Sequence, residues 1–278
     1  MKQSWLMFLL VFSLAVPARA VTPGPAGDDP GLSGLFAKRG VTGTLIIESL
    51  EGRTVWVHNP VRAGERFLPA STFKIPNTLI ALEAGAVRDE KEVIRWDGVR
   101  RSIPSWNRDQ CLATAFQDSC VWFYQELARR VGADDYRCEL GRIGYGNGAS
   151  GPAVDTFWLD GELRISAREQ IDFLKRVYRG EMPVRMENLE ILKRLMVVES
   201  APGYVLRAKT GWALRTPKQL GWYVGWLEIL PPKTASGDGP TVWFFALNMD
   251  FTTREQAPYR VEIVRDALRA KGLLPVAK

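Results

Sequence analysis

Strand-like and helix-like segments occupy separate blocks of this chain, and that distribution limits the possible folds more than any other feature. Runs rich in Val, Trp, Tyr and Phe lie near both ends, and apolar residues at helical spacing fill the stretch between them. Such a chain can pair its two ends in one sheet and leave its middle as an insertion. We therefore predict an α+β protein, with an antiparallel sheet built from both termini and an inserted helical domain.

The individual elements follow from the same pattern. Strands are expected at residues 42–48, 54–58, 205–210, 221–230 and 241–249, with Glu51-Gly52 as the turn between the first two and a polar linker at 231–239 between the last two. Helices are expected from Ser71 to near Gly85, at 121–131, at 168–178 after a Ser166–Glu169 capping box, and from Pro258 to Gly272. The predicted sheet domain comprises residues 34–66 and 200–278, and the predicted helical domain comprises 67–199.

Residues 1–20 have the features of a secretory signal peptide. Lys2 gives a positive start, an apolar stretch runs from Leu6 to Val16, and Ala18-Arg19-Ala20 is a small-x-small cleavage site. The apolar stretch is too short to cross a hydrocarbon layer of ~30 Å, which argues against a membrane anchor. We predict cleavage near Ala20 and a periplasmic protein, in which residues 21–33, rich in Gly, Pro and Asp, form a flexible lead-in.

The charge pattern argues against nucleic-acid and membrane partners. The formal net charge is +6, but Lys and Arg are interleaved with Asp and Glu instead of being clustered. No later run is long and apolar enough for a transmembrane helix. We expect small molecules as partners, and the sequence specifies no oligomeric state.

Three cysteines and one histidine restrict the metal and disulfide chemistry. Because the chain has no Cys-x-x-Cys pair, we expect no metal site. An oxidising compartment allows one disulfide, and Cys111 with Cys120 is the preferred pair because it closes a short loop. The sequence is equally compatible with no bridge between them. Cys138 would be a free thiol in either case.

The single histidine, His58, argues against a Ser-His-Asp triad. It lies at the end of a predicted strand, and we interpret it as a surface residue. The chain also lacks the Gly-x-Ser-x-Gly elbow that would carry a matching nucleophile. If the protein is a hydrolase, we therefore expect its base to be a lysine.

Ser71 and Lys74 form such a pair. Residues three apart share one face of a helix, so the hydroxyl of Ser71 and the amine of Lys74 can meet. A helix start also provides free N–H groups and a positive dipole end where an oxyanion would form. This Ser-x-x-Lys pattern is common by itself, but Lys209-Thr210-Gly211 follows it on a late strand. Together the two motifs are a signature of penicillin-recognising serine enzymes.

Further motifs resemble one family in particular. Ser119-Cys120-Val121, Tyr145-Gly146-Asn147, Trp158 and Arg260 occur in order around the two motifs above. The complete set resembles the class D β-lactamases, the oxacillinase family, over residues 34–275. The resemblance implies hydrolysis of the β-lactam ring through an acyl-enzyme, in a cleft between the two domains.

The resemblance also implies a role for each motif residue. Ser71 would be the nucleophile, and its N–H and that of Trp212 would form the oxyanion hole. Lys74 would be the general base after carboxylation of its Nζ by CO2, with Trp158 binding the carbamate. We expect the amine to be kept neutral by apolar surroundings, supplied by Phe73, Ile75, Val121, Phe157 and Leu159.

The other motif residues would act on the substrate or shape the cleft. Ser119 would relay a proton to the leaving nitrogen, and Val121 and Leu159 would gate the deacylating water. The substrate-binding residues would be Lys209, Thr210, Gly211, Trp212 and Arg260. Tyr145, Gly146 and Asn147 would be structural. Trp122 differs from the family, because many relatives carry a small residue or proline there.

Two related functions are alternatives to hydrolysis. A penicillin-binding transpeptidase and a β-lactam sensor both acylate a serine of this kind. Transpeptidases usually carry Asn at the third position of the second motif, where this chain has Val121. A sensor would keep a stable acyl-enzyme, whereas a β-lactamase loses it rapidly.

Overall fold

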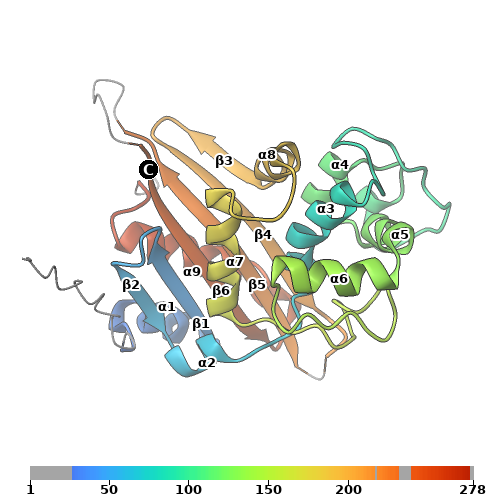
Figure 1. Cartoon of the computed structure of the whole chain (residues 1–278). Helices are drawn as coiled ribbons and strands as arrows, with labels where there is room; N and C mark the ends of the chain where they lie inside the picture. Colours follow the sequence, from blue (N-terminus) through green and yellow to red (C-terminus); the bar gives the residue numbers. More distant parts are fainter. Residues whose placement is uncertain (1–26, 217, 232–238, 276–278) are drawn as a thin grey trace, which may run out of the picture.

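The computed structural model describes residues 27–216, 218–231 and 239–275. Figure 1 shows a central sheet, with helices on both of its faces and a group of helices beside it. The predicted signal peptide at 1–20 and most of the linker at 231–239 lie outside the described residues.

The sheet is six-stranded and antiparallel, and it joins the two ends of the described chain. Its strands are β1 (Gly43–Ser49), β2 (Val55–His58), β3 (Val197–Ala201), β4 (Tyr204–Ala213), β5 (Gln219–Ile229) and β6 (Thr241–Phe251). They lie in the order β2-β1-β6-β5-β4-β3, so that an early strand pairs with the last one. The predicted α+β architecture is confirmed. The edge strand β3 was not predicted, and the expected domain boundary at 199/200 falls inside it.

Alternating side chains of the strands bury the two faces of the sheet in different cores. On β5, Tyr223 and Leu227 face the core covered by α1 (Pro30–Arg39) and α9 (Tyr259–Ala270). Val224 and Trp226 face the opposite core, against which α7 (Ala167–Arg179) packs. The period of two in a strand causes this division, and it produces a three-layer molecule.

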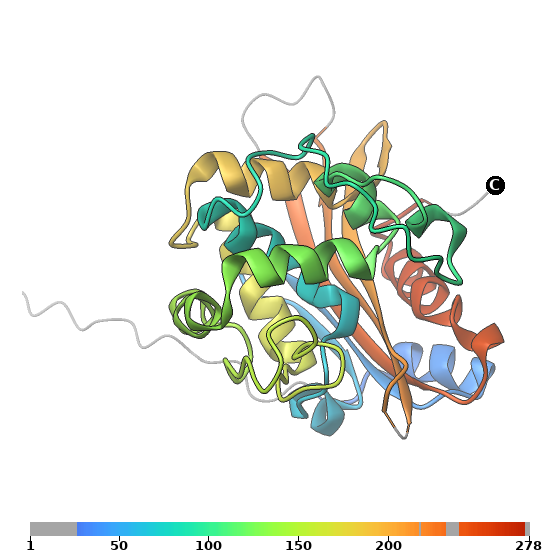
Figure 2. The same cartoon turned by 90° about the vertical axis from the view of Figure 1, so that its right-hand side faces the viewer.

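A group of helices lies beside the sheet (Figure 2). It comprises α3 (Lys74–Glu83), α4 (Leu112–Gln117), α5 (Val121–Val131), α6 (Ala133–Ile143) and α8 (Met186–Leu195), with the 3-10 turns η1 (Ala70–Phe73) and η2 (Pro104–Trp106). The short helix α2 (Pro60–Gly64) instead packs against β1 and α7, and the 3-10 turn η3 (Arg254–Gln256) lies just before α9. Helix α5 has the predicted bounds, and α7 begins with the predicted capping box of Ser166 and Glu169.

The predicted flexible lead-in is wrong where it meets the described residues. Residues 30–33 form the first turn of α1 instead, and Asp29 caps that helix by accepting a hydrogen bond from the N–H of Leu32 at 3.0 Å. The Asp and Pro residues that suggested disorder are an N-cap and a first-turn proline. Leu32 and Phe36 are buried against the sheet, and this burial stabilises the helix.

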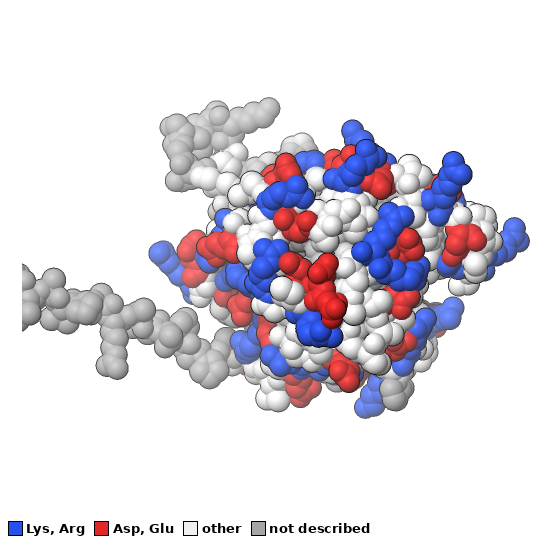
Figure 3. All heavy atoms as spheres, turned by 45° about the vertical axis from the view of Figure 1, so that its right-hand side comes forward, with Lys and Arg blue, Asp and Glu red and all other residues white. Residues whose placement is uncertain are grey.

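One face of the molecule shows charges of both signs. Lys and Arg are interspersed with Asp and Glu on the face shown in Figure 3. Within the described ranges, none of the helices has the length and apolar character needed to span a bilayer.

Candidate active site

A cleft of about 380 Å³ lies where the group of helices meets β4. Ser71, Ser119, Val121 and Leu159 line it from the helical side, and Thr210, Gly211 and Trp212 line it from the strand. Arg260 lines it from the start of α9. The fold thus brings most of the predicted site residues to one cavity.

Ser71 lies in the 3-10 turn η1, and α3 begins only at Lys74. The prediction that Ser71 starts the α-helix is therefore wrong by one turn. Side chains three apart eclipse one another in a 3-10 turn, which aligns the pair more directly than an α-helix would. Lys74 Nζ donates a hydrogen bond to Ser71 Oγ at 3.0 Å.

The backbone of this turn has an unusual conformation. Ala70, just before the nucleophile, has a φ of 47°, in the left-handed region that residues other than glycine rarely adopt. Its N–H donates to the carbonyl oxygen of Trp158 at 3.0 Å. The surrounding structure therefore holds Ser71 in a strained turn, as is common at active sites.

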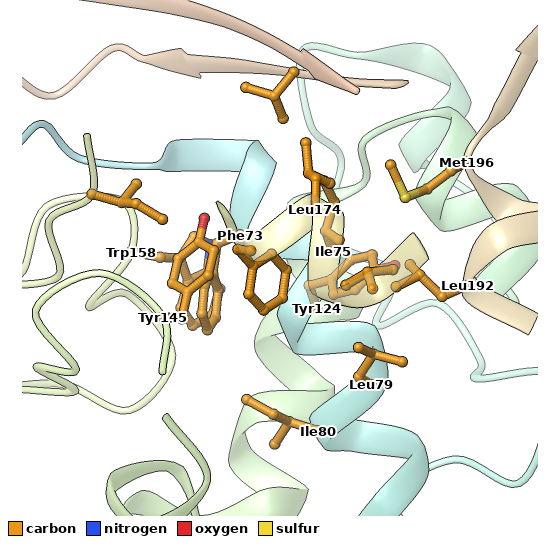
Figure 4. Close-up of a cluster of buried hydrophobic side chains, with 14 of the residues drawn as sticks. Phe73, Ile75, Leu79, Ile80, Tyr124, Tyr145, Trp158, Leu174, Leu192 and Met196 are labelled. Carbon is orange, nitrogen blue, oxygen red and sulfur yellow. The ribbon is translucent and has the colours of Figure 1, made fainter. Parts of the chain in front are cut away.

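Lys74 is a buried amine in aromatic surroundings. Its side chain has no exposed surface, and Nζ lies 5.0 Å from the ring centre of Tyr124. Beside it Phe73 packs against Trp158 and Tyr145, with ring centres 5.2 and 5.8 Å apart (Figure 4). Burial lowers the pKa of Lys74 to about 7, with a smaller opposing effect of Cys120. A substantial fraction of the amine is therefore neutral near pH 7 and able to accept a proton.

Ser119, the second serine of the cleft, is hydrogen-bonded to Lys209. Lys209 Nζ donates to Ser119 Oγ at 3.0 Å and to the carbonyl of Thr210 at 3.2 Å. Burial, together with the positive charges of Lys74 and Arg260, moves the pKa of Lys209 well below its usual value. A proton can thus pass along hydroxyl and amine groups at this side of the cleft.

Gly211 allows β4 to approach the nucleophile turn. A Cβ atom at Gly211 would lie 3.0 Å from the carbonyl oxygen of Pro69 and 3.1 Å from Cγ2 of Thr72. The glycine makes room for the turn η1, and thereby brings Thr210 and Trp212 beside Ser71.

Arg260 lines the cleft with its guanidinium between two aromatic rings. Its guanidinium carbon lies 5.7 Å from the ring centres of both Trp212 and Phe251. Its Nε and Nη1 are buried and have no hydrogen-bond partner among the described residues. Burial lowers the pKa of Arg260 to about 10, so the group is still charged at neutral pH. An unpaired buried charge is unfavourable, which suits a site completed by an anionic ligand.

The Tyr-Gly-Asn motif supports the cleft from outside it. The hydroxyl of Tyr145 accepts a hydrogen bond from Gln170 Nε2 at 3.3 Å. Asn147 Oδ1 accepts from the N–H of Arg164 at 2.9 Å. Gly146 has a φ of 57°, and a Cβ there would collide with the Arg164 carbonyl at 2.1 Å. These contacts connect two loops below the nucleophile.

The preferred disulfide is absent, since all three cysteines are free. The Cys111 sulfur lies 3.7 Å from Thr114 Oγ1 at the start of α4. Cys120 is the residue just before α5, and burial raises the pKa of its thiol to about 11. The two cysteines therefore precede two different helices.

His58 lies outside the cleft, as expected. Its Nδ1 is 2.9 Å from Ser33 Oγ and 3.2 Å from Asp28 Oδ1, at the start of α1. Ser33 and Asp28 approach the same ring nitrogen, which is not the arrangement of a catalytic triad.

Sequence reasoning missed several residues that line the cleft. They are Ile103, Trp106, Asp118, Leu214 and Arg215. All lie in loops or turns, where no periodicity predicts the direction of a side chain. A tryptophan outside any periodic segment, as at position 106, is the one signal that could have indicated a binding surface.

The site combines a buried Ser71–Lys74 pair with Ser119 hydrogen-bonded to Lys209, and β4 faces both serines across the cleft. This arrangement is typical of serine enzymes that catalyse acyl transfer. Residues 57–268 match the family model of the penicillin-binding protein transpeptidase domain. The chain is 44% identical over 243 residues to Beta-lactamase OXA-20 of Pseudomonas aeruginosa, covering 86% of each chain. It is 40% identical over 240 residues to Beta-lactamase OXA-48 of Klebsiella pneumoniae, covering 86% of this chain and 87% of that one.

Solved structures agree with these relatives. The class D β-lactamase YbXI from Nostoc has a TM-score of 0.82 at 40% identity, over 87% of this chain and 99% of that one. FUS-1 (OXA-85) from Fusobacterium nucleatum has a TM-score of 0.84 at 34% identity, over 90% of this chain and 100% of that one. The chain belongs to the class D β-lactamases.

Proposed function

We propose that the protein hydrolyses β-lactam antibiotics through an acyl-enzyme on Ser71, with Lys74 as the general base for acylation and deacylation. The observation that carries this proposal is the 3.0 Å contact between Ser71 Oγ and a fully buried Lys74 whose pKa is lowered to about 7. A base works best when its pKa is close to the working pH.

In acylation, Ser71 Oγ attacks the carbonyl carbon of the lactam and gives its proton to the Lys74 side chain. The N–H groups of Ser71 and Trp212 stabilise the oxyanion; losing one such donor typically raises the barrier by roughly 3–4 kcal/mol. The C–N bond of the ring then breaks, and Ser119 delivers a proton to the leaving nitrogen. The proton taken up by the Lys74 side chain returns to Ser119 through the hydroxyl and amine groups of the cleft, so that Lys74 is again unprotonated. The product is an ester on Ser71.

In deacylation, one water adds to the ester carbonyl and restores the Ser71 hydroxyl. The Lys74 side chain accepts a proton from that water, and the ring-opened acid leaves. Val121 and Leu159, which both line the cleft, would control where the water stands.

The site fits a carboxylated Lys74. Carbamate formation requires a neutral amine, and burial lowers the pKa of Lys74 to about 7. Trp158 is buried beside this site, with its ring stacked on Phe73 at 5.2 Å between ring centres. When bound as a carbamate, CO2 would supply an anionic oxygen base in place of the amine. Trp158 would then donate to that anion and hold it in position.

The substrate carboxylate would be bound by cations. Arg260 lines the cleft and has buried N–H donors without a partner among the described residues, and Lys209 and Thr210 lie on β4. A guanidinium fork matches a carboxylate in shape and charge. This arrangement favours β-lactams, which carry a carboxylate or its equivalent beside the ring nitrogen.

The first experiment measures steady-state hydrolysis of benzylpenicillin and a chromogenic cephalosporin, with and without added bicarbonate. We expect many turnovers per enzyme, stimulated by bicarbonate. Lys74→Ala should lower kcat by at least about 10³-fold, because general-base catalysis contributes that order of rate. Lys91→Ala, which removes an exposed lysine, is the matched control and should behave as wild type.

Two results would contradict the proposal. Wild-type turnover by Lys74→Ala, or no response to bicarbonate, would exclude the carboxylated lysine as base. A single stoichiometric burst without turnover would favour a sensor or a transpeptidase, since both acylate without rapid release.

Export to the periplasm belongs to the same proposal, because β-lactams act there. The support is the signal-peptide pattern of residues 1–20. Amino-terminal sequencing of the protein from a periplasmic extract tests it, and a start near Val21 is the expected result.

A further inference from the structure

Two tryptophans connect the mouth of the cleft to the active-site helices. The indole Nε1 of Trp122, in the first turn of α5, donates to the backbone carbonyl of Trp106 at 2.7 Å. The indole Nε1 of Trp106 in turn donates to the carbonyl of Asp118 at 2.9 Å. The turn η2 is therefore bound both to α5 and to the residue just before Ser119.

The loop held in this way forms an apolar wall of the cleft. Ile103 and Trp106 both line the cavity, and Ile103 is 41% exposed. The loop itself contains no β-strand or long helix, since η2 is only three residues long. Its position depends on side-chain hydrogen bonds, and the Trp122 indole supplies one from a buried, helical position.

Further contacts fix Trp122 itself. Its side chain is 4% exposed, and the guanidinium carbon of Arg101 lies 5.6 Å from its ring centre. Arg101 is also paired with Asp97 at 2.6 Å within the same loop. The indole thus has one defined orientation, as a residue that positions another group requires.

We propose that Trp122 is a positioning residue that holds the Ile103–Trp106 wall, and that this wall selects β-lactams with large apolar acyl side chains. The inference rests on the β-lactamase activity proposed above. Trp122 does not line the cleft, so it acts through Trp106 and not on the substrate.

The test compares two substrates with the same ring system. Benzylpenicillin carries an aromatic acyl side chain, and 6-aminopenicillanic acid carries none. In Trp122→Phe, which keeps an apolar ring but removes the donor, kcat/KM for benzylpenicillin should fall about tenfold, mainly through KM. The value for 6-aminopenicillanic acid should change less than about twofold.

Trp96→Phe is the matched control. Trp96 lies on the same stretch of chain and its indole donates to the Val99 carbonyl at 3.1 Å, away from α5. The Trp96→Phe variant should leave unchanged the ratio of kcat/KM for benzylpenicillin to kcat/KM for 6-aminopenicillanic acid. If Trp122→Phe also leaves that ratio unchanged, or lowers both values equally, the inference is wrong. If wild type turns over neither substrate, the proposed function fails instead.

A second pair of variants distinguishes positioning from general damage. Ile103→Ala shortens the wall directly and should lower the same ratio. If Trp122 acts through the wall, adding Trp122→Phe to Ile103→Ala should have little further effect; full additivity would overturn the inference. Should Trp122→Phe fail to fold, Trp106→Phe breaks the second link at a half-buried position and should shift the ratio in the same direction.

Discussion

At the scale of single residues, the chemistry of this protein depends on burying groups that a fold normally keeps in water. Lys74 has no exposed surface, and Arg260 has buried N–H groups without a partner among the described residues. Each lowered pKa reflects a cost of burial, because the charged form loses its hydration. The site therefore trades stability for a neutral base and an available cation.

Replacing Lys74 by methionine should stabilise the fold, and more so at low pH. The unfolded chain keeps a lysine pKa of 10.5, whereas burial lowers the folded value to about 7. The unfolded state therefore binds more protons between these values, and the destabilisation by Lys74 is full below pH 7 and declines as pH rises. The gain from Lys74→Met should fall by up to about 1.4 kcal/mol per pH unit above pH 7.

Urea unfolding at pH 6 and pH 9, in buffers depleted of CO2, measures this difference. Lys91→Met serves as the control, since residue 91 is exposed. A gain in free energy of unfolding that is the same at both pH values would show that Lys74 titrates normally in the folded protein.

At the scale of elements, the positions of two helix starts explain why Cys111 and Cys120 form no disulfide. Cys111 and Cys120 directly precede α4 and α5, and the Cys111 sulfur contacts Thr114 of its own helix. A short sequence separation suggested a disulfide, but separation alone does not determine where two Cβ atoms point. Helix formation on both sides of residues 118–119 sets that direction.

Thiol titration distinguishes these alternatives. In denaturant without reductant, we expect three reactive thiols per chain, in accordance with three free cysteines. In the native state the exposed Cys138 should react rapidly and the buried Cys120 slowly. A single thiol in denaturant would show that Cys111 and Cys120 are bridged.

At the scale of the whole molecule, the cleft exists because β4 of the sheet packs against η1 of the helical region. Gly211 is the point of closest approach, with Pro69 and Thr72 on the other side. The sheet supplies Lys209, Thr210 and Trp212, and the helical region supplies both serines. Neither region alone contains the complete site.

Gly211→Ala should therefore damage activity more than folding. Its Cβ would meet a backbone oxygen at 3.0 Å, so η1 must shift away from β4. Overpacking of this kind costs about 1–3 kcal/mol of stability. A displacement of the nucleophile should lower kcat/KM by roughly 10²-fold.

Steady-state kinetics and thermal unfolding together test this change. The control is Gly34→Ala in α1, where a Cβ would meet nothing within 4 Å. It should leave activity unchanged and raise stability by roughly 1 kcal/mol, because alanine favours a helix. Unaltered kcat/KM in Gly211→Ala would mean that the close contact does not position Ser71.

The sequence by itself determined the succession of elements and the motif residues. Strand and helix periodicity, the capping box at Ser166 and the Ser71–Lys74 spacing are all local properties, carried by neighbouring residues. They sufficed to predict a sheet built from both termini and the family resemblance. The lead-in misled, since Asp29 and Pro30 occur in helix caps as well as in disordered segments. The preferred Cys111–Cys120 disulfide and the α-helix start at Ser71 were also wrong.

Only the tertiary structure decided what surrounds those residues. The lowered pKa of Lys74, the close fit at Gly211 and the wall of Ile103 and Trp106 all depend on segments far apart in the chain. The edge strand β3 likewise exists by pairing with β4. Burial and close approach are properties of contacts between segments, and a pattern read along one segment does not contain them.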